Sequence, residues 1–576
     1  MRKENVLISL GIFFCFVFLF AAFFHPTTVD YDLGRHLLFG KIMLETDSVI
    51  KTNLISFSNT NFNYVNSHWL SEIIFFIIFK FLSFNGLILF TVGISSITFF
   101  MIFLFALKRF SALSILLSSV VCVRLMSSRT EIRPEIFSYF FLSIFLVILY
   151  KFRENGTKLI FLLIPLEALW VNLHINFIIG IILPGLFLLD NLIENKFKLS
   201  KKLIILLIVF VSLTISSLFN PSFVKGAIFP LTFYKNYALP VQENTNLFLF
   251  LSDRYLGYIP LLGIGTIMAS LFFLLFYYRK KIYTIDWLLV FVFSLAFIYA
   301  VRNISLFAYA IFIPLTRILT FLPKDLQRFL DKNLSQKKLT FLKRFTIFFI
   351  FLTILGSIVT LVEHHSFGFG VIESGKNAIE FYKKNALKGP VYNNFNSGEY
   401  LAYRLYPQEK VFVDARPEAY PNDFFLKTYI PLQLNPTDFK KVNQKYNFNV
   451  IFMFNLFESH ASISYFLNNP NYKLIYLDDI SLIFLKNNNQ NKKIIDSYLI
   501  NEKSFIFPKI KDEKQIIGFL GVFDKMGWIK QERIAYGYLH EIDPTDCYLK
   551  NNLSLYAQKD NVLKNIKVDL RYKCLW

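Results

Sequence analysis

The chain has 576 residues, of which 55% are hydrophobic, and its 61 lysines and arginines against 40 aspartates and glutamates give a formal net charge of +21. A mean hydropathy of +0.46 over this length excludes an ordinary soluble protein. The basic residues gather in short loops between apolar stretches, and no basic stripe interleaved with aromatic residues is present. We therefore expect a lipid bilayer as partner and no nucleic acid.

Long apolar stretches predict a polytopic membrane domain over residues 1–362, because about 20 apolar residues cross a bilayer as a helix. The first stretch follows two basic residues and has no small-residue cleavage site after it, so we interpret it as a retained anchor. A further apolar stretch, 69–83, is short and carries Glu72 and Lys80, which predicts an interfacial or re-entrant helix. The predicted spans, about eleven in number, are 6–24, 86–107, 111–126, 134–150, 159–172, 175–193, 203–219, 257–278, 284–300, 304–322 and 345–362.

The basic loops predict how these spans are oriented. If the N-terminus lies in the cytoplasm and each span crosses once, every cytoplasmic loop is basic, as the positive-inside rule requires. The first extracytoplasmic loop is then 25–68, and everything after residue 362 is also extracytoplasmic. The other segments on that side are 127–133, 173–174, 220–256 and 301–303.

The pattern after residue 362 is that of a water-soluble region. Short strands alternate with helices over 363–486, which predicts a small α/β domain with a partly parallel sheet. The predicted strands include 390–395, 410–414 and 449–454, and the predicted helices include 374–385 and 461–468. The asparagine-rich segment that opens 487–511 is typical of a linker. Residues 512–576 predict a helical hairpin that turns at Gly527; it resembles a degenerate tetratricopeptide repeat with the start of a second, and a plain hairpin is the alternative. If this tail is extracytoplasmic, Cys547 and Cys574 could form a disulfide.

Polar and charged residues gather in or beside the extracytoplasmic segments. Such groups are costly next to membrane spans and usually mark a pathway or a reaction centre. Their position at one face predicts a site that opens to a single compartment. The residues are Asp30, Asp32, His36, His68, Glu72, Arg129, Arg133, Asn172, His174, Asn220 and Arg302.

Two carboxylates in the first extracytoplasmic loop could do chemistry together. Asp30 and Asp32 stand two residues apart, and His36 follows one helical turn after Asp32 if a helix begins there. One carboxylate can act as a general base on a hydroxyl while the other orients it or binds a divalent cation such as Mg²⁺ or Mn²⁺. Solvated loop or helix-capping residues are the simpler alternative.

The remaining polar residues also allow two interpretations each. Arg129, Arg133 and Arg302 could clamp a phosphate, or could extend to the interface and pair with nearby glutamates. His68 and Glu72 share a helix face, which fits either a binding site or an ordinary amphipathic anchor helix. His174 fits a ligand contact or a residue that stabilises its own tight turn, and neither interpretation is excluded by its spacing.

The chain contains the motifs Asp30-x-Asp32-x-x-x-His36, Asn66-x-His68-Trp69-Leu70-Ser71-Glu72, Arg133-Pro134-Glu135-x-Phe137-Ser138, Trp170-x-Asn172-x-His174, Asn220-Pro221, Arg302-Asn303 and, in the tail, Asp414-x-Arg416. In this order they resemble a family of polytopic bacterial membrane proteins that are similar to type C (GT-C) glycosyltransferases, such as protein mannosyltransferases and aminoarabinose transferases. The resemblance extends to about residue 486. Two departures are Leu33-Gly34-Arg35 in place of an aromatic pair and Ser67-His68-Trp69 in place of a His-Glu-Trp run; the second leaves Glu72 as the acid of its helix and puts a metal role in doubt.

This resemblance implies an inverting transfer of a sugar from a polyprenyl-phosphate donor to an extracytoplasmic glycan, lipid or protein. It gives Asp30 or Asp32 the role of base, and Arg133 and Arg302 the role of holding the donor phosphate. The histidines at 36 and 174, together with Glu72, would position groups nearby. It also implies a multi-pass protein of the bacterial inner membrane, with a cytoplasmic N-terminus and an extracytoplasmic C-terminal domain.

Two other functions are consistent with the sequence. A transporter or flippase for a lipid-linked glycan would favour mid-membrane polar residues, broken helices and an internal repeat, and no convincing repeat is present. A non-catalytic membrane scaffold is favoured by the helical C-terminus and disfavoured by the retention of Asp30, Asp32 and Arg133.

Overall fold

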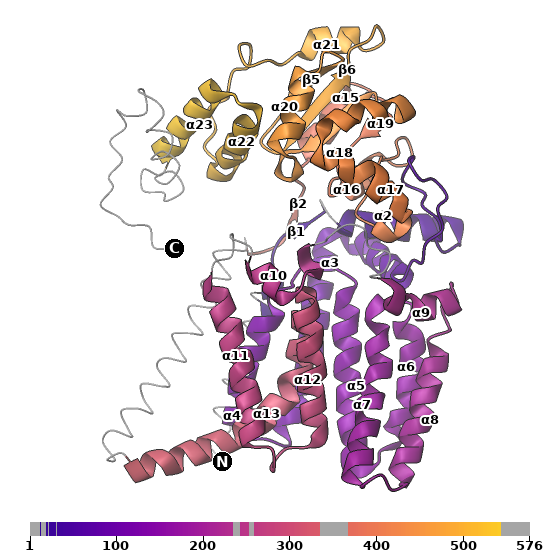
Figure 1. Ribbon diagram of the computed structural model, residues 1–576, viewed down its shortest axis with the longest axis vertical. Helices are drawn as coiled ribbons and strands as arrows, with labels where there is room; N and C mark the ends of the chain where they lie inside the picture. The colour runs from indigo at the N-terminus through magenta and orange to yellow at the C-terminus, as the bar shows by residue number, and fades with distance from the viewer. Residues whose placement is uncertain are drawn as a thin grey trace. The chain divides into compact units, whose positions relative to one another are not determined.

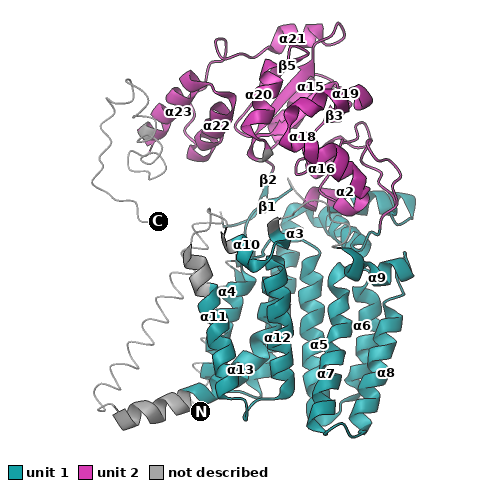
Figure 2. Ribbon diagram, viewed as in Figure 1, with its two compact units in different colours: residues 1–29, 36–51, 65–372 teal, residues 30–35, 52–64, 373–576 magenta. Residues whose placement is uncertain are grey.

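The computed structural model describes residues 12, 16, 19–20, 22–29, 32–233, 242–252, 258–333 and 367–542. It is mostly helical and divides into two compact units, coloured separately in Figure 2. The first unit comprises residues 1–29, 36–51 and 65–372, and the second comprises 30–35, 52–64 and 373–576. Each unit is described by itself below.

The first unit is a bundle of apolar helices. Figure 1 shows α5, α7, α6 and α8 side by side, and these helices contact one another. A two-stranded parallel pair, β1 (Thr27–Thr28) with β2 (Val371–Ile372), joins its first and last segments. The helices are α2 (Asp32–Thr46, whose first turn belongs to the second unit), α3 (Trp69–Leu107), α4 (Ala112–Met126), α5 (Glu135–Asn155), α6 (Leu163–Trp170), α7 (Ile178–Glu194), α8 (Lys201–Ser216), α9 (Val224–Thr232), α10 (Leu247–Ser252), α11 (Tyr258–Tyr277), α12 (Thr284–Tyr299) and α13 (Ile304–Asn333). Short 3₁₀ turns are η1 (Lys158–Leu162), η2 (Ile175–Phe177), η4 (Gln242–Asn244) and η5 (Val301–Asn303).

Four helical stretches of the described chain are long and apolar enough to cross a membrane, as expected for a protein with a bilayer partner. Large apolar side chains such as Ile97, Leu104 and Phe291 are half exposed on the helix surfaces, which suits a lipid environment. The predicted total of about eleven spans stays a prediction, since 345–362 and most of 6–24 lie outside the described residues. The four stretches are Trp69–Leu107, Glu135–Asn155, Ile175–Glu194 and Val301–Leu322.

Two predicted helices differ in detail from the sequence pattern. The long helix α3 is interrupted at Ser83 (φ 58°, ψ −163°), so the predicted interfacial segment 69–83 ends at a real break before the span that follows. The predicted span 159–172 is instead a 3₁₀ turn, η1, followed by the short helix α6. Pro165, in the first turn of α6, has no backbone N–H to donate to the preceding turn, and a tighter 3₁₀ winding accommodates this.

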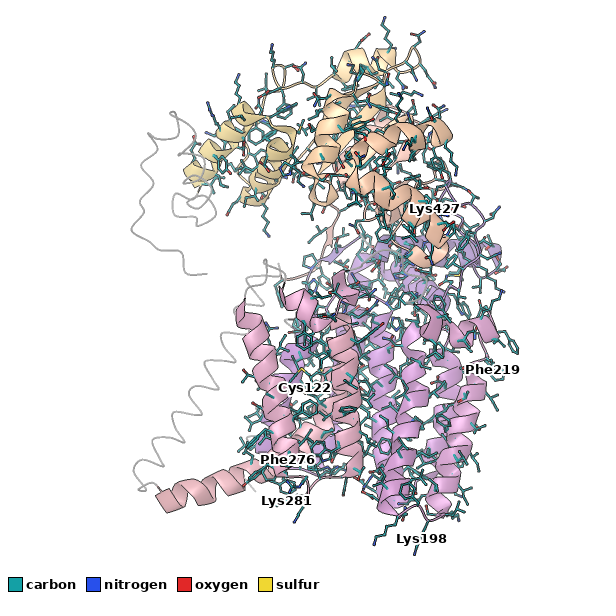
Figure 3. The ribbon with its side chains drawn as sticks, viewed as in Figure 1. Cys122, Lys198, Phe219, Phe276, Lys281 and Lys427 are labelled. Carbon is teal, nitrogen blue, oxygen red and sulfur yellow. The ribbon has the colours of Figure 1, made fainter. Side chains whose placement is uncertain are left out.

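The ends of the bundle carry different side chains. Figure 3 shows Lys198 and Lys281, from two of the loops predicted to be cytoplasmic, at the same end of the first unit, and both are exposed. Phe219, in the turn that precedes α9, lies toward the other end and is 67% exposed. The basic loops that surround Lys198 and Lys281 therefore share one end of the bundle, as the positive-inside pattern requires.

The second unit contains the predicted α/β domain. Its sheet has the order β3-β4-β6-β5, in which β3 and β4 are parallel and the other pairs antiparallel, so the partly parallel sheet is present. The predicted strand 410–414 is not one: Val411 makes only single bridges, to Val391 and to Ser56 of the first loop. The strands are β3 (Val391–Tyr392), β4 (Val450–Phe454), β5 (Tyr472–Leu477) and β6 (Ser481–Lys486). The main helices are α15 (Lys376–Lys384), α16 (Gly398–Leu405), α17 (Asn422–Phe424), α18 (Ile430–Leu434), α19 (Phe439–Tyr446) and α20 (His460–Asn468).

The C-terminal part of the second unit is helical. The predicted linker 487–511 contains a short helix, α21 (Lys492–Tyr498), so it is only partly irregular. The helices α22 (Glu513–Met526) and α23 (Ile529–Ile542) form the predicted hairpin around Gly527, whose φ of 69° is readily adopted by glycine. The expected second repeat, with Cys547 and Cys574, lies outside the described residues.

Candidate functional site

Three arginines and two glutamates meet at the start of α5 in the first unit. Arg129 makes a bidentate pair with Glu135, with its Nε and Nη2 at 2.9 and 2.7 Å from the two carboxylate oxygens. Arg302 donates to the same glutamate at 2.8 Å. Glu243 accepts from Arg129 at 2.5 Å and from Arg133 at 3.1 and 3.2 Å. We call these five residues the N-terminal network of α5.

Local structure places each member of this network. Pro134 precedes the first helical residue, Glu135, and proline is suited to a helix start because it needs no hydrogen-bond acceptor there. Glu243 lies in η4 and Arg302 in η5, and these two turns are joined by a hydrogen bond from Val301 N to Thr245 O of 3.2 Å. Arg302 also donates to the Asn244 side chain at 3.1 Å.

The electrostatics of the network favour its charged form. Burial by itself would raise the pKa of Glu243, but Arg133, Arg129 and Arg302 outweigh it and hold that pKa below its usual value. The side chains of Arg133 and Arg302 are 22% and 21% exposed, and that of Arg129 is 12% exposed. Guanidinium groups that are partly accessible and already bound to carboxylates are suited to phosphate as well, because the two anions have similar bidentate geometry.

A row of histidines adjoins this network. His36 is hydrogen-bonded through Nδ1 to Glu72 at 3.0 Å, and both side chains are buried. The other oxygen of Glu72 accepts from Asn66 at 2.8 Å. The ring of His68 lies close to the rings of both His36 and His174. The distances between ring centroids are 5.9 Å to His36 and 5.1 Å to His174. The carboxylate fixes the orientation of the His36 ring, as a carboxylate does in many catalytic pairs.

His174 links the histidine row to α5. Its Nδ1 accepts from the backbone N–H of Asn176 at 3.3 Å, so the hydroxyl of Ser138, 2.8 Å away, donates to that nitrogen as well. Trp170 donates to the same hydroxyl oxygen at 2.9 Å. Burial lowers the pKa of His174 to about 3, which makes it neutral at ordinary pH. Because Ser138 lies one turn after Glu135, the histidines and the arginines form one continuous polar cluster.

Two of the predicted residues have evident structural roles. Asn172 accepts from the Trp69 indole at 2.9 Å and donates to the Phe219 carbonyl at 2.7 Å, and so ties three segments together. Asn220 donates to the carbonyl groups of Ser217 and Phe223 and thereby closes its own turn. Neither contact requires a ligand.

The carboxylates of the first loop belong to the other unit. Asp32 begins α2, and its carboxylate lies 3.9 Å from Arg35, which in turn pairs with Glu399 at 2.7 Å. Asp30 lies outside the described residues. No group of three or more His, Cys, Asp or Glu side chains in the described ranges is arranged to hold a metal ion.

The second unit also shows what its tail motif does. Arg416 forms a buried bidentate pair with Asp414, at 2.6 and 2.8 Å. Its Nη2 also donates to the side-chain oxygen of Asn53, and its Nη1 donates to the Tyr64 hydroxyl, each at 3.1 Å. The motif therefore holds the segment 52–64 of the first loop on the tail domain, which is a structural task.

An apolar cavity of about 740 Å³ lies in the first unit beside η5. Its walls come mainly from α7 and α12, with one or two residues from each of the neighbouring helices and turns. The few polar residues on its wall are Arg302, Asn303, Asn176 and Asn246. Arg302 thus belongs both to the cavity wall and to the N-terminal network.

Sequence reasoning missed several members of these clusters. Glu243 lies in the long extracytoplasmic segment predicted at 220–256, where no pattern distinguishes it from a solvated residue. Ser138 ends the motif that begins at Arg133, but no role in the site was predicted for it. At the other end of α5, a second set of paired charges lies within predicted spans or beside them, where their rarity was a usable signal. We call Arg153, Arg317, Asp190, Asp286 and Glu194 the C-terminal network of α5.

No known family model matches this chain, and no curated protein matches it. The contacts above are therefore the basis for a function. They offer an anion-binding arginine cluster, a buried Glu72–His36 pair and an apolar cavity that reaches one of the arginines.

Proposed function

We propose that this protein is an integral-membrane glycosyltransferase, which moves a sugar from a polyprenyl-phosphate donor to an extracytoplasmic acceptor with inversion. The observation that carries the proposal is the double position of Arg302, on the wall of an apolar cavity and within a cluster of arginines. A donor of this class has two parts, a long hydrocarbon chain and a phosphate. The cavity suits the first part and the arginines suit the second.

The size and charge of the site support this assignment. Binding cavities for small ligands measure about 300–1,000 Å³, and this one, at about 740 Å³, accommodates several isoprene units rather than the whole chain. The rest of the chain would lie among the half-exposed apolar side chains of the helix surfaces. The guanidinium groups of Arg133 and Arg302 would stabilise the negative charge that grows on the phosphate as its bond to the sugar breaks.

The chemistry assigned to the first loop follows from the resemblance. Asp30 or Asp32 takes the proton of the acceptor hydroxyl, and the acceptor oxygen bonds to the anomeric carbon from the face opposite the phosphate. The carbon–oxygen bond to phosphate breaks, and polyprenyl phosphate leaves with that electron pair. The Glu72–His36 pair and His174 position groups near the donor.

Orientation in the membrane is part of the proposal: bacterial inner membrane, cytoplasmic N-terminus, extracytoplasmic tail. The shared end of Lys198 and Lys281 supports it. A phosphatase reporter fused after residue 362 should be active, and one fused within 324–344 should be silent. The reverse result would place the arginines on the cytoplasmic side, where extracytoplasmic transfer is impossible.

A flippase for a lipid-linked glycan is the second candidate, because the same cavity and arginines would accept the same lipid. The two functions differ in their products. A transferase consumes the donor and releases polyprenyl phosphate, whereas a flippase leaves the donor intact on the other leaflet.

The deciding experiment compares envelope glycans, by mass spectrometry, in cells that carry the wild-type chain, Asp32→Asn or Arg302→Gln. A matched control is Arg279→Gln, which changes an exposed arginine of a loop predicted to be cytoplasmic. We expect the first two variants to lose a glycan while the protein stays at normal abundance in the membrane. Unchanged glycans in both would refute the proposal, and intact donor that accumulates on the cytoplasmic leaflet would favour the flippase.

A further inference from the structure

We propose that Glu243 is a built-in occupant of the arginine site, whose carboxylate is displaced when the phosphate of the donor binds. The inference concerns the regulation of the proposed site, and it rests on the proposed function for the identity of the incoming anion. The first observation that supports it is the position of the Glu243 side chain. Glu243 bridges Arg129 and Arg133, at 2.5 Å and 3.1 Å, and thereby occupies the position between two guanidinium groups that an anionic ligand would take.

The two glutamates of the network are not equivalent. Glu135 belongs to the first turn of α5, accepts from the Tyr139 hydroxyl at 2.9 Å and has a side chain that is only 8% exposed. Glu243 lies in the short turn η4, and its side chain is 33% exposed. Glu135 is therefore a fixed part of the scaffold, whereas Glu243 is accessible to a competing anion.

Displacement of Glu243 does not require the turn to unfold. The backbone of this segment is attached to η5 by the bond from Val301 N to Thr245 O, and the neighbouring Asn244 side chain accepts from Arg302. A rotation of the Glu243 side chain alone would free its contacts with Arg129 and Arg133 while these attachments persist. Because the Glu243 side chain is partly exposed, water weakens its ion pairs, and a phosphate with two charge-assisted contacts can replace it.

Two consequences follow for donor binding. The carboxylate balances the arginines when the site is empty, so that they are not left as unpaired charges in a partly buried place. It also competes with every incoming phosphate and so weakens donor binding. Removal of its charge should therefore increase the affinity for phosphate monoesters.

The test measures binding to the full-length protein in lipid nanodiscs, with polyprenyl phosphate, inorganic phosphate and the uncharged polyprenol as probes. The variants are Glu243→Gln, Arg133→Gln and a matched control, Glu131→Gln, which removes an exposed carboxylate from the turn that precedes α5. We expect Glu243→Gln to bind polyprenyl phosphate about tenfold more tightly, Glu131→Gln to bind as wild type does, and Arg133→Gln to bind more weakly. Polyprenol binding should be the same in all four proteins.

The outcomes separate this inference from the proposed function. If Arg133→Gln weakens binding but Glu243→Gln does not strengthen it for either phosphate probe, Glu243 is not a competitor, and the donor site still stands. If neither variant changes binding, the donor site itself is wrong. A gain for both phosphate probes shows that the phosphate alone displaces Glu243, and a gain for polyprenyl phosphate alone shows that the lipid is needed. Should Glu243→Gln fail to fold, Glu243→Asp, which draws the carboxylate back by one methylene, is expected to bind phosphate more tightly than wild type, and equal binding would overturn the inference.

Discussion

The two ends of α5 carry networks of the same chemistry with different surroundings. Glu135 and Arg153 are separated along the helix by about 27 Å, at about 1.5 Å per residue. In the N-terminal network the arginines are partly exposed, one glutamate comes from a surface turn, and Arg302 reaches the apolar cavity. This end is therefore suited to exchange one anion for another.

Most of the C-terminal network is closed by additional contacts, and only its Glu194, 42% exposed, is as accessible as Glu243. Asp286 is fully buried, pairs with Arg317 at 2.8 Å and accepts from the Tyr150 hydroxyl at 2.8 Å. Asp190 pairs with Arg153 and also accepts from a backbone N–H of α12 at 2.8 Å. The guanidinium carbons of both arginines lie over the ring of Tyr283, at 3.6 and 4.0 Å. Paired charges at this end join α5, α7, α12 and α13, whereas we propose that similar ion pairs at the other end give way to a ligand.

The largest expected difference between the networks is in stability. Arg317→Ala leaves the fully buried Asp286 without its ion pair, and such a change typically costs about 3–5 kcal/mol. Arg302→Ala should cost about 1 kcal/mol or less, because Arg302 is partly exposed and Glu135 keeps its bidentate pair with Arg129. Denaturant titration of the purified protein measures both free energies of unfolding. Equal losses would mean that the N-terminal network is as structural as the other.

A carboxylate whose pKa is raised by burial should show the opposite pH dependence from one whose pKa is lowered by arginines. Glu458 in the second unit is buried and accepts from Asn394 at 3.0 Å. Burial raises its pKa to about 7 from a usual 4.5, although Asn394, Lys525 and Ser462 act in the other direction. The folded state therefore binds this proton more tightly than the unfolded state. The stability it contributes is present below about pH 4.5 and is lost as pH rises to about 7, by up to about 3 kcal/mol at about 1.36 kcal/mol per pKa unit.

The contribution of Glu243 to stability depends on pH in the opposite direction, because the arginines lower its pKa. Its contribution is present above the unfolded pKa and is lost as the pH falls. Unfolding measured between pH 4 and 8 should thus become less dependent on pH in Glu458→Gln, with the gain in stability at the alkaline end. In Glu243→Gln the stability should instead fall at neutral and alkaline pH, where the contribution of Glu243 is present, and should approach that of the wild type at the acid end. A Glu458→Gln protein with an unaltered pH profile would contradict the assigned pKa.

The sequence could predict the arginines of the site and nearby glutamates as their partners, but not the distant partner Glu243. Arg129, Arg133 and Arg302 stand out because charges at the ends of apolar spans are rare and costly, and this signal is local. The pairing of Arg129 with Glu243 joins residues that are far apart in the chain, and no local pattern specifies it. The same is true of Asn53 and Arg416, whose contact fixes part of the first loop on the tail domain.

Secondary structure was predictable where the hydrophobic residues of a segment follow one clear period. The hairpin around Gly527 and the helices α15 and α20 have an amphipathic pattern and a clear start or end, and they were predicted correctly. The predicted strand at 410–414 was wrong. Val411, Phe412 and Val413 are apolar because they are buried, but a strand also needs continuous hydrogen bonds to a neighbouring strand, and Val411 makes only isolated bridges. Pro165 was a visible signal for the shortened α6, although an apolar run of that length favours one continuous helix.

The smallest predicted effect concerns the packing between the two networks, where α7 approaches α5 and α6. A Cβ added at Gly180 would lie 2.0 Å from a carboxylate oxygen of the buried Glu167 and 3.2 Å from the Phe145 ring. Among the described residues neither oxygen of Glu167 has a hydrogen-bond partner, so no hydrogen bond opposes a shift of the carboxyl. Because the side chain is fully buried, however, it has little room to move. We expect Gly180→Ala to destabilise the protein by about 1 kcal/mol, since overpacking outweighs the better helix propensity of alanine.

The matched control for this packing is Gly185→Ala on the same helix, where the new Cβ would meet only the Phe210 ring at 3.4 Å, an ordinary contact. Alanine should stabilise the protein there by up to about 1 kcal/mol, because it is the better helix former. The double variant Gly180→Ala with Glu167→Ala should recover the lost stability, since the obstructing carboxyl is gone. If instead Gly180→Ala behaves like Gly185→Ala, close packing at Gly180 does not hold α7 against α5, and the ion pairs of the C-terminal network carry that contact.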